Sequence, residues 1–182
     1  MKFILLKNYD EISNYAAEFV CKRINDFYIK NFNNSKFFIL GLPTGSTPIG
    51  MYSKLVEFYK IGKVSFKRVK TFNMDDHIDI DPSNIDIPNG KADSLLDECK
   101  RYEEAILASG GIDLFVSGIG SDGHIAFNEP GSSISHMTTA SVLQMHGNCI
   151  WLVDELPEYL KIFELTPLQQ QTKNITNNNN CL

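Results

Sequence analysis

The residue with the clearest chemical potential is His124, which lies in the glycine-rich stretch 118–130, called here the His124 segment. Asp122 precedes His124 and Glu129 follows it within this segment. An imidazole flanked by carboxylates can be oriented as a proton shuttle that works near neutral pH. A lone histidine is more often structural. A serine-hydrolase triad is a further alternative, although neither nearby serine lies in a G-x-S-x-G elbow. The segment therefore favours acid–base chemistry.

Two adjacent carboxylates, Asp75 and Asp76, lie just beyond the run 69–73. A carboxylate at the end of a buried strand can act as a general base, because burial and a charged neighbour adjust its pKa. A plain turn or helix cap is the commoner role for such an aspartate. Asp79 and Asp81 extend the acidic run, but it lacks the glycine and distal glutamate of a calcium loop, so no metal site is predicted.

The turn-forming stretch 41–47 is rich in groups that can meet an anion. Gly45 allows close backbone approach, and Thr44, Ser46 and Thr47 add hydroxyl donors. A helix is predicted to follow, and a helix N-terminus favours an anion such as phosphate. The spacing is not that of a P-loop, and no lysine follows it. Plain turn chemistry is the alternative interpretation.

Hydrophobic periodicity shows how these stretches would be positioned. Short apolar runs predict strands, and apolar residues at helical spacing predict helices. The predicted strands are 3–6, 37–40, 69–73, 114–116 and 149–153; the predicted helices are 12–27, 52–59, 95–107 (opened by Asp93 or Ser94) and, more weakly, 140–145 and 157–165. Such alternation predicts a Rossmann-like α/β fold, with three layers around a mostly parallel sheet and ligands beyond the carboxyl ends of its strands.

The composition indicates a single domain over residues 1–165, followed by a disordered polar tail at 166–182. The chain has 182 residues, of which 43% are hydrophobic, enough for one core. Its net charge of −5 and pI near 5.3 predict neither a nucleic-acid nor a membrane partner, so a small molecule is expected. Four scattered cysteines, with no leader peptide and no apolar run near about 18 residues, predict a cytoplasmic protein.

Three of these stretches together closely resemble the glucosamine-6-phosphate deaminase (isomerase) family. They are L-G-L-P-T-G-S-T-P at 40–48, T-F-N-M-D at 71–75 and G-S-D-G-H-I-A-F-N-E-P at 120–130. The resemblance runs over residues 1–75, about 77–133 and about 136–162. The related 6-phosphogluconolactonases share the D-G-H element but continue with a serine-leucine-phenylalanine pattern where this chain has A-F-N-E, which favours the deaminase branch.

The resemblance implies an aldose–ketose isomerase that releases ammonia. Asp75 would move a proton between C2 and C1 of the opened glucosamine 6-phosphate, giving fructose 6-phosphate. His124, held by Asp122 and Glu129, would assist ring opening, and residues 44–47 would supply part of the phosphate site. No metal or organic cofactor is implied. The reaction would belong to the catabolism of N-acetylglucosamine.

The resemblance also implies that the chain is shortened by two internal gaps. A block containing a His-Pro-x-Ser-Tyr element is missing after Asp75. A larger block between Ser133 and His136 would have carried the arginine and lysine that grip the phosphate. Charge-assisted hydrogen bonds contribute about 1.5–3 kcal/mol each, so losing both cations would cost about 3–6 kcal/mol, or a factor of about 10²–10⁴ in affinity. We expect native-like family structure through Val116 and incomplete packing after Ser133.

The resemblance also has implications for oligomeric state and allosteric regulation. Many family members are hexamers, and some bind N-acetylglucosamine 6-phosphate as an allosteric activator at a subunit interface. Ser132 matches one contributor to that site, and the other contributors have no counterparts here. Three functions therefore remain open: a deaminase, a 6-phosphogluconolactonase-like hydrolase, and a non-catalytic protein that binds a sugar phosphate or associates with a full-length subunit.

Overall fold

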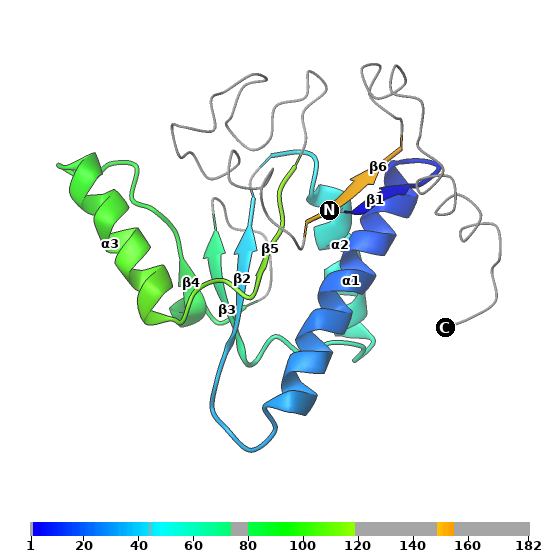
Figure 1. Cartoon of the computed structure of the whole chain (residues 1–182), viewed down its shortest axis with the longest axis horizontal. Coiled ribbons are helices and arrows are strands. Elements are labelled where there is room, and N and C mark those ends of the chain that lie inside the picture. Colours follow the sequence, from blue (N-terminus) through cyan, green and yellow to red (C-terminus); the bar gives the residue numbers. More distant parts are fainter. Residues whose placement is uncertain (1, 44, 74–79, 119–148, 155–182) are drawn as a thin grey trace.

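The structure is a computed structural model that describes residues 2–43, 45–73, 80–118 and 149–154 (Figure 1). Its elements in chain order are β1 (Lys2–Leu5), α1 (Tyr9–Lys30), β2 (Phe38–Leu42), α2 (Ile49–Lys60), β3 (Val69–Asn73), the 3-10 turn η1 (Pro82–Asn84), β4 (Ile85–Asp86), α3 (Leu95–Ala108), β5 (Leu114–Phe115) and β6 (Ile150–Val153). The predicted alternation of strands and helices is confirmed over these residues.

Every described strand pair is parallel. β2 and β3 pair along their whole lengths in a four-stranded sheet of order β4-β3-β2-β5. β1 and β6 form a second, two-stranded sheet, in which Phe3 lies opposite Trp151. The predicted strand 149–153 is thus confirmed as β6, and it pairs with the N-terminal strand. The α/β class and the parallel pairing are confirmed, whereas the described strands lie in two sheets rather than one.

Local sequence explains where the helices begin. The side chain of Asn8 accepts a hydrogen bond from the Glu11 backbone N–H at the start of α1. Ser94 does the same for the Asp97 N–H at the start of α3, so Ser94 rather than Asp93 is the N-cap. A capping side chain satisfies a backbone donor that has no partner inside the helix.

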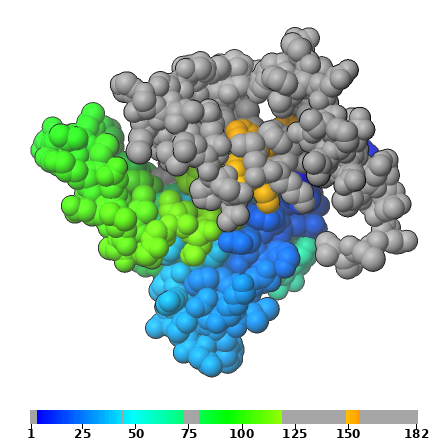
Figure 2. Space-filling view, viewed as in Figure 1, coloured from blue at the N-terminus to red at the C-terminus, as the bar shows by residue number. Residues whose placement is uncertain are grey.

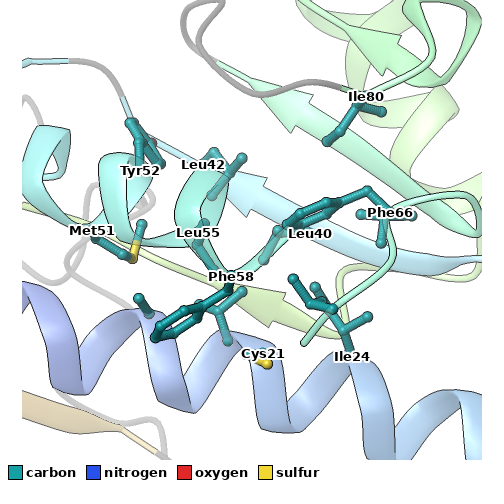
Figure 3. Close-up of a cluster of buried hydrophobic side chains, with 14 of the residues drawn as sticks. Cys21, Ile24, Leu40, Leu42, Met51, Tyr52, Leu55, Phe58, Phe66 and Ile80 are labelled. Atoms are coloured by element: carbon teal, nitrogen blue, oxygen red, sulfur yellow. The ribbon is translucent and has the colours of Figure 1, made fainter. Parts of the chain in front are cut away.

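The hydrophobic core lies between the larger sheet and the pair α1 and α2 (Figure 3). Ile24 of α1, Leu40 of β2 and Leu55 of α2 are completely buried within it. All five residues of β2 are buried, as expected for the central strand of a parallel sheet. Each such side chain contributes about 1.5–3 kcal/mol when fully buried. This core holds β2 and α2 in place, and with them the turn that joins the two elements.

α3 lies on the other side of the sheet from α1 and α2, next to β4, and gives the third layer of the arrangement (Figure 1). The ring of Phe72 in β3 packs edge-on against Tyr102 of α3, with ring centroids 5.5 Å apart. This layer is thin, since α3 has no fully buried residue. Leu95, Leu96 and Leu107 are 61%, 68% and 75% exposed, and α3 stands out at one edge of the molecule (Figure 2).

Several predictions concern other parts of the chain. The helices expected at 140–145 and 157–165 and the tail at 166–182 lie outside the described residues. The same holds for most of the segment after Ser133, so its incomplete packing and the single-domain boundary at residue 165 stay predictions. None of the helices in the part of the chain that the structure describes has the length and apolar character needed to cross a bilayer.

Candidate active site

Three neighbouring strands bring the candidate segments to one edge of the sheet. β2 lies between β3 and β5, and Leu42 at its end pairs with Asn73 at the end of β3. On the other side Gly41 pairs with Phe115, and its carbonyl accepts a hydrogen bond from the Val116 N–H at 2.9 Å. Because the strands are parallel, their carboxyl ends share this edge. The segments that follow the three strands therefore start side by side.

The central segment is the β2–α2 loop, residues 43–48. Gly45 has φ +93°, a left-handed conformation that favours glycine. Gly45, Ser46 and Thr47 are exposed, so their polar groups are accessible to a ligand. The buried hydroxyl of Tyr52 donates to the carbonyl of Pro43 at 2.7 Å and fixes the start of the loop to α2. Thr44 lies outside the described residues.

The N-terminus of α2, directly after this loop, differs from those of α1 and α3. Its N-cap residue, Pro48, provides no side-chain hydrogen bond, and the first turn of α2 contains no acidic residue. α1 and α3 each have both a capping side chain and acidic residues in the first turn. The Ile49 and Gly50 N–H groups at this end donate to the Ser46 carbonyl and the Tyr9 hydroxyl, and the helix dipole there favours an anion beside the exposed loop. The loop and helix together suit a phosphate group.

The His124 segment begins in contact with the β2–α2 loop. A Cβ atom built on Gly118 would lie 3.1 Å from Thr47 Cβ and 3.2 Å from Thr47 Oγ1. The backbone at Gly118 therefore passes close to the Thr47 side chain, and a side chain at position 118 would crowd it. Two of the three stretches identified in the sequence thus meet in space.

The remaining predicted residues cannot be placed. Asp75, Asp122, His124, Glu129 and Ser132 all lie outside the described residues, so their roles stay predictions. Within residues 2–43, 45–73, 80–118 and 149–154, no group of three or more His, Cys, Asp or Glu side chains could hold a metal ion. The described part of the site consists of neutral groups from the β2–α2 loop and the start of α2.

Tyr9 is the site component that the sequence did not indicate. Its hydroxyl reaches from the start of α1 to the β2–α2 loop, where it lies 3.0 Å from the carbonyl oxygen of Thr47 and 2.8 Å from the backbone N of Gly50. The apolar periodicity of α1 marked only its core face, so it contained no signal for this contact.

Comparison with known proteins identifies close relatives. A glucosamine-6-phosphate deaminase from Drosophila pseudoobscura pseudoobscura is 47% identical over 165 residues, covering 79% of this chain and 59% of the relative. The solved structure of a monomeric glucosamine-6-phosphate deaminase matches with a TM-score of 0.63 and 33% identity, covering 80% of this chain and 68% of that protein. A 6-phosphogluconolactonase from Plasmodium vivax matches with a TM-score of 0.57 and 19% identity, covering 70% of this chain and 51% of that protein.

These matches differ in what they establish. No protein-family model matches the chain. The lactonase similarity, at 19% identity, establishes a shared fold alone. The deaminase matches have much higher sequence identity, 47% and 33%, and confirm the resemblance predicted from the three loops. The chain spans only 59% of the length of the fly relative. The chain belongs to the glucosamine-6-phosphate deaminase family.

Proposed function

We propose that this chain binds glucosamine 6-phosphate and converts it, with water, to fructose 6-phosphate and ammonia. The observation that carries the proposal is the contact between Thr47 and Gly118, because it joins the candidate phosphate loop to the start of the segment that contains His124. In this proposal residues 44–47 and the N-terminus of α2 receive the phosphate. The sugar then extends over the carboxyl ends of β3 and β5.

The chemistry is assigned to the residues that follow those two strands. His124, oriented by Asp122 and Glu129, moves the proton that opens the pyranose ring. Asp75 takes the proton from C2 of the open-chain sugar, forming an enolamine, and returns it to C1. Water then adds at C2, and the amino group leaves as ammonia. Neither a metal ion nor an organic cofactor takes part in this scheme.

The affinity of the site is expected to be modest. The described loop offers backbone and hydroxyl donors, but the family's arginine and lysine for the phosphate have no counterparts in this chain. Their absence would weaken binding by a factor of about 10²–10⁴ relative to a full-length family member. Millimolar substrate is therefore the appropriate concentration range for assays.

The biological setting follows from the same assignment. In this proposal the reaction belongs to carbohydrate metabolism, within the catabolism of N-acetylglucosamine. The cytoplasm is the proposed compartment, because the four cysteines are scattered along the sequence without a C-x-x-C spacing. We expect a small sugar phosphate, rather than nucleic acid or membrane, as the partner of the site.

A second candidate is a non-catalytic protein that associates with a full-length subunit of the same family. The exposed leucines at the two ends of α3, Leu95 and Leu96 at its start and Leu107 near its last residue, favour this alternative, because a full-length subunit could cover these apolar side chains. In that role the chain would retain sugar-phosphate binding without turnover.

The decisive experiment supplies purified chain with glucosamine 6-phosphate and measures ammonia and fructose 6-phosphate in separate coupled assays. Equal amounts of both products, absent with the Asp75→Asn variant, would support the deaminase. Binding of the substrate without either product, together with co-purification with a full-length subunit, would support the association role. Acid release from 6-phosphogluconolactone above the spontaneous rate would favour the lactonase. A chain that neither binds nor converts glucosamine 6-phosphate would refute the proposal.

A further inference from the structure

The Tyr9 hydroxyl, at the start of α1, forms hydrogen bonds with the end of the β2–α2 loop and with the first turn of α2. It donates its hydrogen to the carbonyl of Thr47, at 3.0 Å, with the carbonyl of Ser46 as a longer alternative at 3.3 Å. It also accepts a hydrogen bond from the Gly50 N–H at 2.8 Å. The Tyr9 side chain is therefore the hydrogen-bond partner of both a carbonyl of the β2–α2 loop and a backbone N–H in the first turn of α2.

The packing around Gly50 allows this arrangement. A Cβ atom at Gly50 would overlap Ser13 Oγ and would lie 2.9 Å from Tyr9 Cε1. Ser13 is 3% exposed on the inner face of α1, so it has little room to move. The absence of a side chain at Gly50 lets the first turns of α1 and α2 approach closely enough for the Tyr9 hydroxyl to reach the loop.

The two hydrogen bonds of the Tyr9 hydroxyl fix the backbone of the candidate phosphate site. A ligand at the N-terminus of α2 needs backbone N–H groups held in a fixed geometry, because each mobile donor must be ordered upon binding. The Gly50 N–H itself donates to Tyr9 and is therefore not offered to the ligand, but its bond to Tyr9 fixes the first turn of α2. The bond from Tyr9 to the Thr47 carbonyl fixes the loop residue that lies close to Gly118. The exposed residues 45–47 are thereby left to face the ligand.

We propose that Tyr9 is a positioning residue for the phosphate site: its hydroxyl holds the β2–α2 loop in the geometry that receives a sugar phosphate. The proposal rests on the proposed function for the identity of the ligand. Tyr9 is 45% exposed, so its ring contributes little to the core, and removing the hydroxyl should act on the loop rather than on global stability.

The test compares Tyr9→Phe with Tyr59→Phe in the full chain. Tyr59 is a matched control because it is 42% exposed and lies near the other end of α2, where its ring packs against Phe66. Amide hydrogen exchange measured by NMR reports on the loop, and titrations with inorganic phosphate and with glucosamine 6-phosphate report on the site. Thermal melts of both variants test whether the fold is preserved.

We expect the Gly50 amide of Tyr9→Phe to exchange about 3- to 10-fold faster than in the unmodified chain, and the Kd for both ligands to rise by a similar factor. Tyr59→Phe should change neither quantity. If the unmodified chain binds both ligands and Tyr9→Phe binds them equally well, the inference is wrong and the proposed function stands. If the unmodified chain binds neither ligand, both the proposed function and the positioning role of Tyr9 are wrong. This holds even if the Gly50 amide exchanges faster in Tyr9→Phe than in the unmodified chain.

Discussion

Replacing Gly50 by alanine should destabilise the protein, because the new methyl group has no space. Its Cβ would lie 2.9 Å from both Ser13 Cβ and Tyr9 Cε1 and would overlap Ser13 Oγ. Real Cβ atoms do not approach other heavy atoms this closely, so α1 and α2 would have to move apart. Overpacking of this kind costs about 1–3 kcal/mol. The better helix propensity of alanine recovers at most about 1 kcal/mol of that.

The net expectation for Gly50→Ala is a loss of up to about 3 kcal/mol in the free energy of unfolding. At about 2–4 °C per kcal/mol for a chain of this size, the midpoint should fall by up to about 12 °C. Urea unfolding followed by circular dichroism measures the free energy, and a thermal scan measures the midpoint. Gly90→Ala is the matched control, because a Cβ at Gly90 meets no atom within 4 Å, and its effect should stay within about 0.5 kcal/mol.

A double-mutant cycle separates overpacking from other causes. Ser13→Gly removes two of the three atoms that the new methyl group would strike, Ser13 Cβ and Oγ, and leaves only the edge of the half-exposed Tyr9 ring. The substitution costs up to about 1 kcal/mol in helix propensity. If the clash explains the loss, Gly50→Ala should cost less in the Ser13→Gly background than in the original chain, so the two changes should couple by at least about 0.5 kcal/mol. Additive effects, or a Gly50→Ala variant more stable than the original chain, would refute the reasoning.

Three further predictions concern the site and the β4–α3 junction. In a chain that is active, Asp75→Asn should lower turnover by a factor of about 10²–10⁴, since an amide cannot accept the C2 proton; retained turnover would eliminate Asp75 as the base. His124→Ala should slow ring opening more than it weakens binding, and an unchanged rate constant would remove His124 from the mechanism. Hydrogen bonds from Arg101 and from a backbone N–H lower the pKa of Glu98 from 4.5 to about 2. The stabilisation that these contacts give should therefore be complete above about pH 4.5 and be lost as the pH falls toward 2. Urea unfolding between pH 2 and 6 should show a stability that falls with pH less steeply in Glu98→Gln than in the original chain, because only the share of Glu98 is removed.

The β2–α2 loop was the part of the site most accessible to prediction. Its glycine, its hydroxyl residues and its place between a strand and a helix are all local features, and the structure positions Gly45–Thr47 accordingly. Tyr9 was not accessible in this way. Its hydroxyl meets residues about forty positions further along the chain, and no periodicity in α1 encodes that distance.

The regular elements show how much the sequence by itself determined. β3 occupies the predicted residues 69–73, and α3 begins after Ser94 at Leu95, because side-chain periodicity and capping act within one or two turns of the chain. The family assignment likewise came from the three loop motifs, whose residue types and spacing are properties of the sequence.

Only the tertiary structure decided how distant segments meet. The two-residue strand β4 has too little sequence to show a pattern and exists because β3 offers it an edge. β6 pairs with β1 from the far end of the chain, and Arg68 donates to the backbone carbonyls of Asn31, Asn34 and Lys36. Such contacts form when packing of the core brings separate segments together, and their geometry depends on the whole fold. The approach of Gly118 to Thr47, which joins the two halves of the described site, is a contact of this kind.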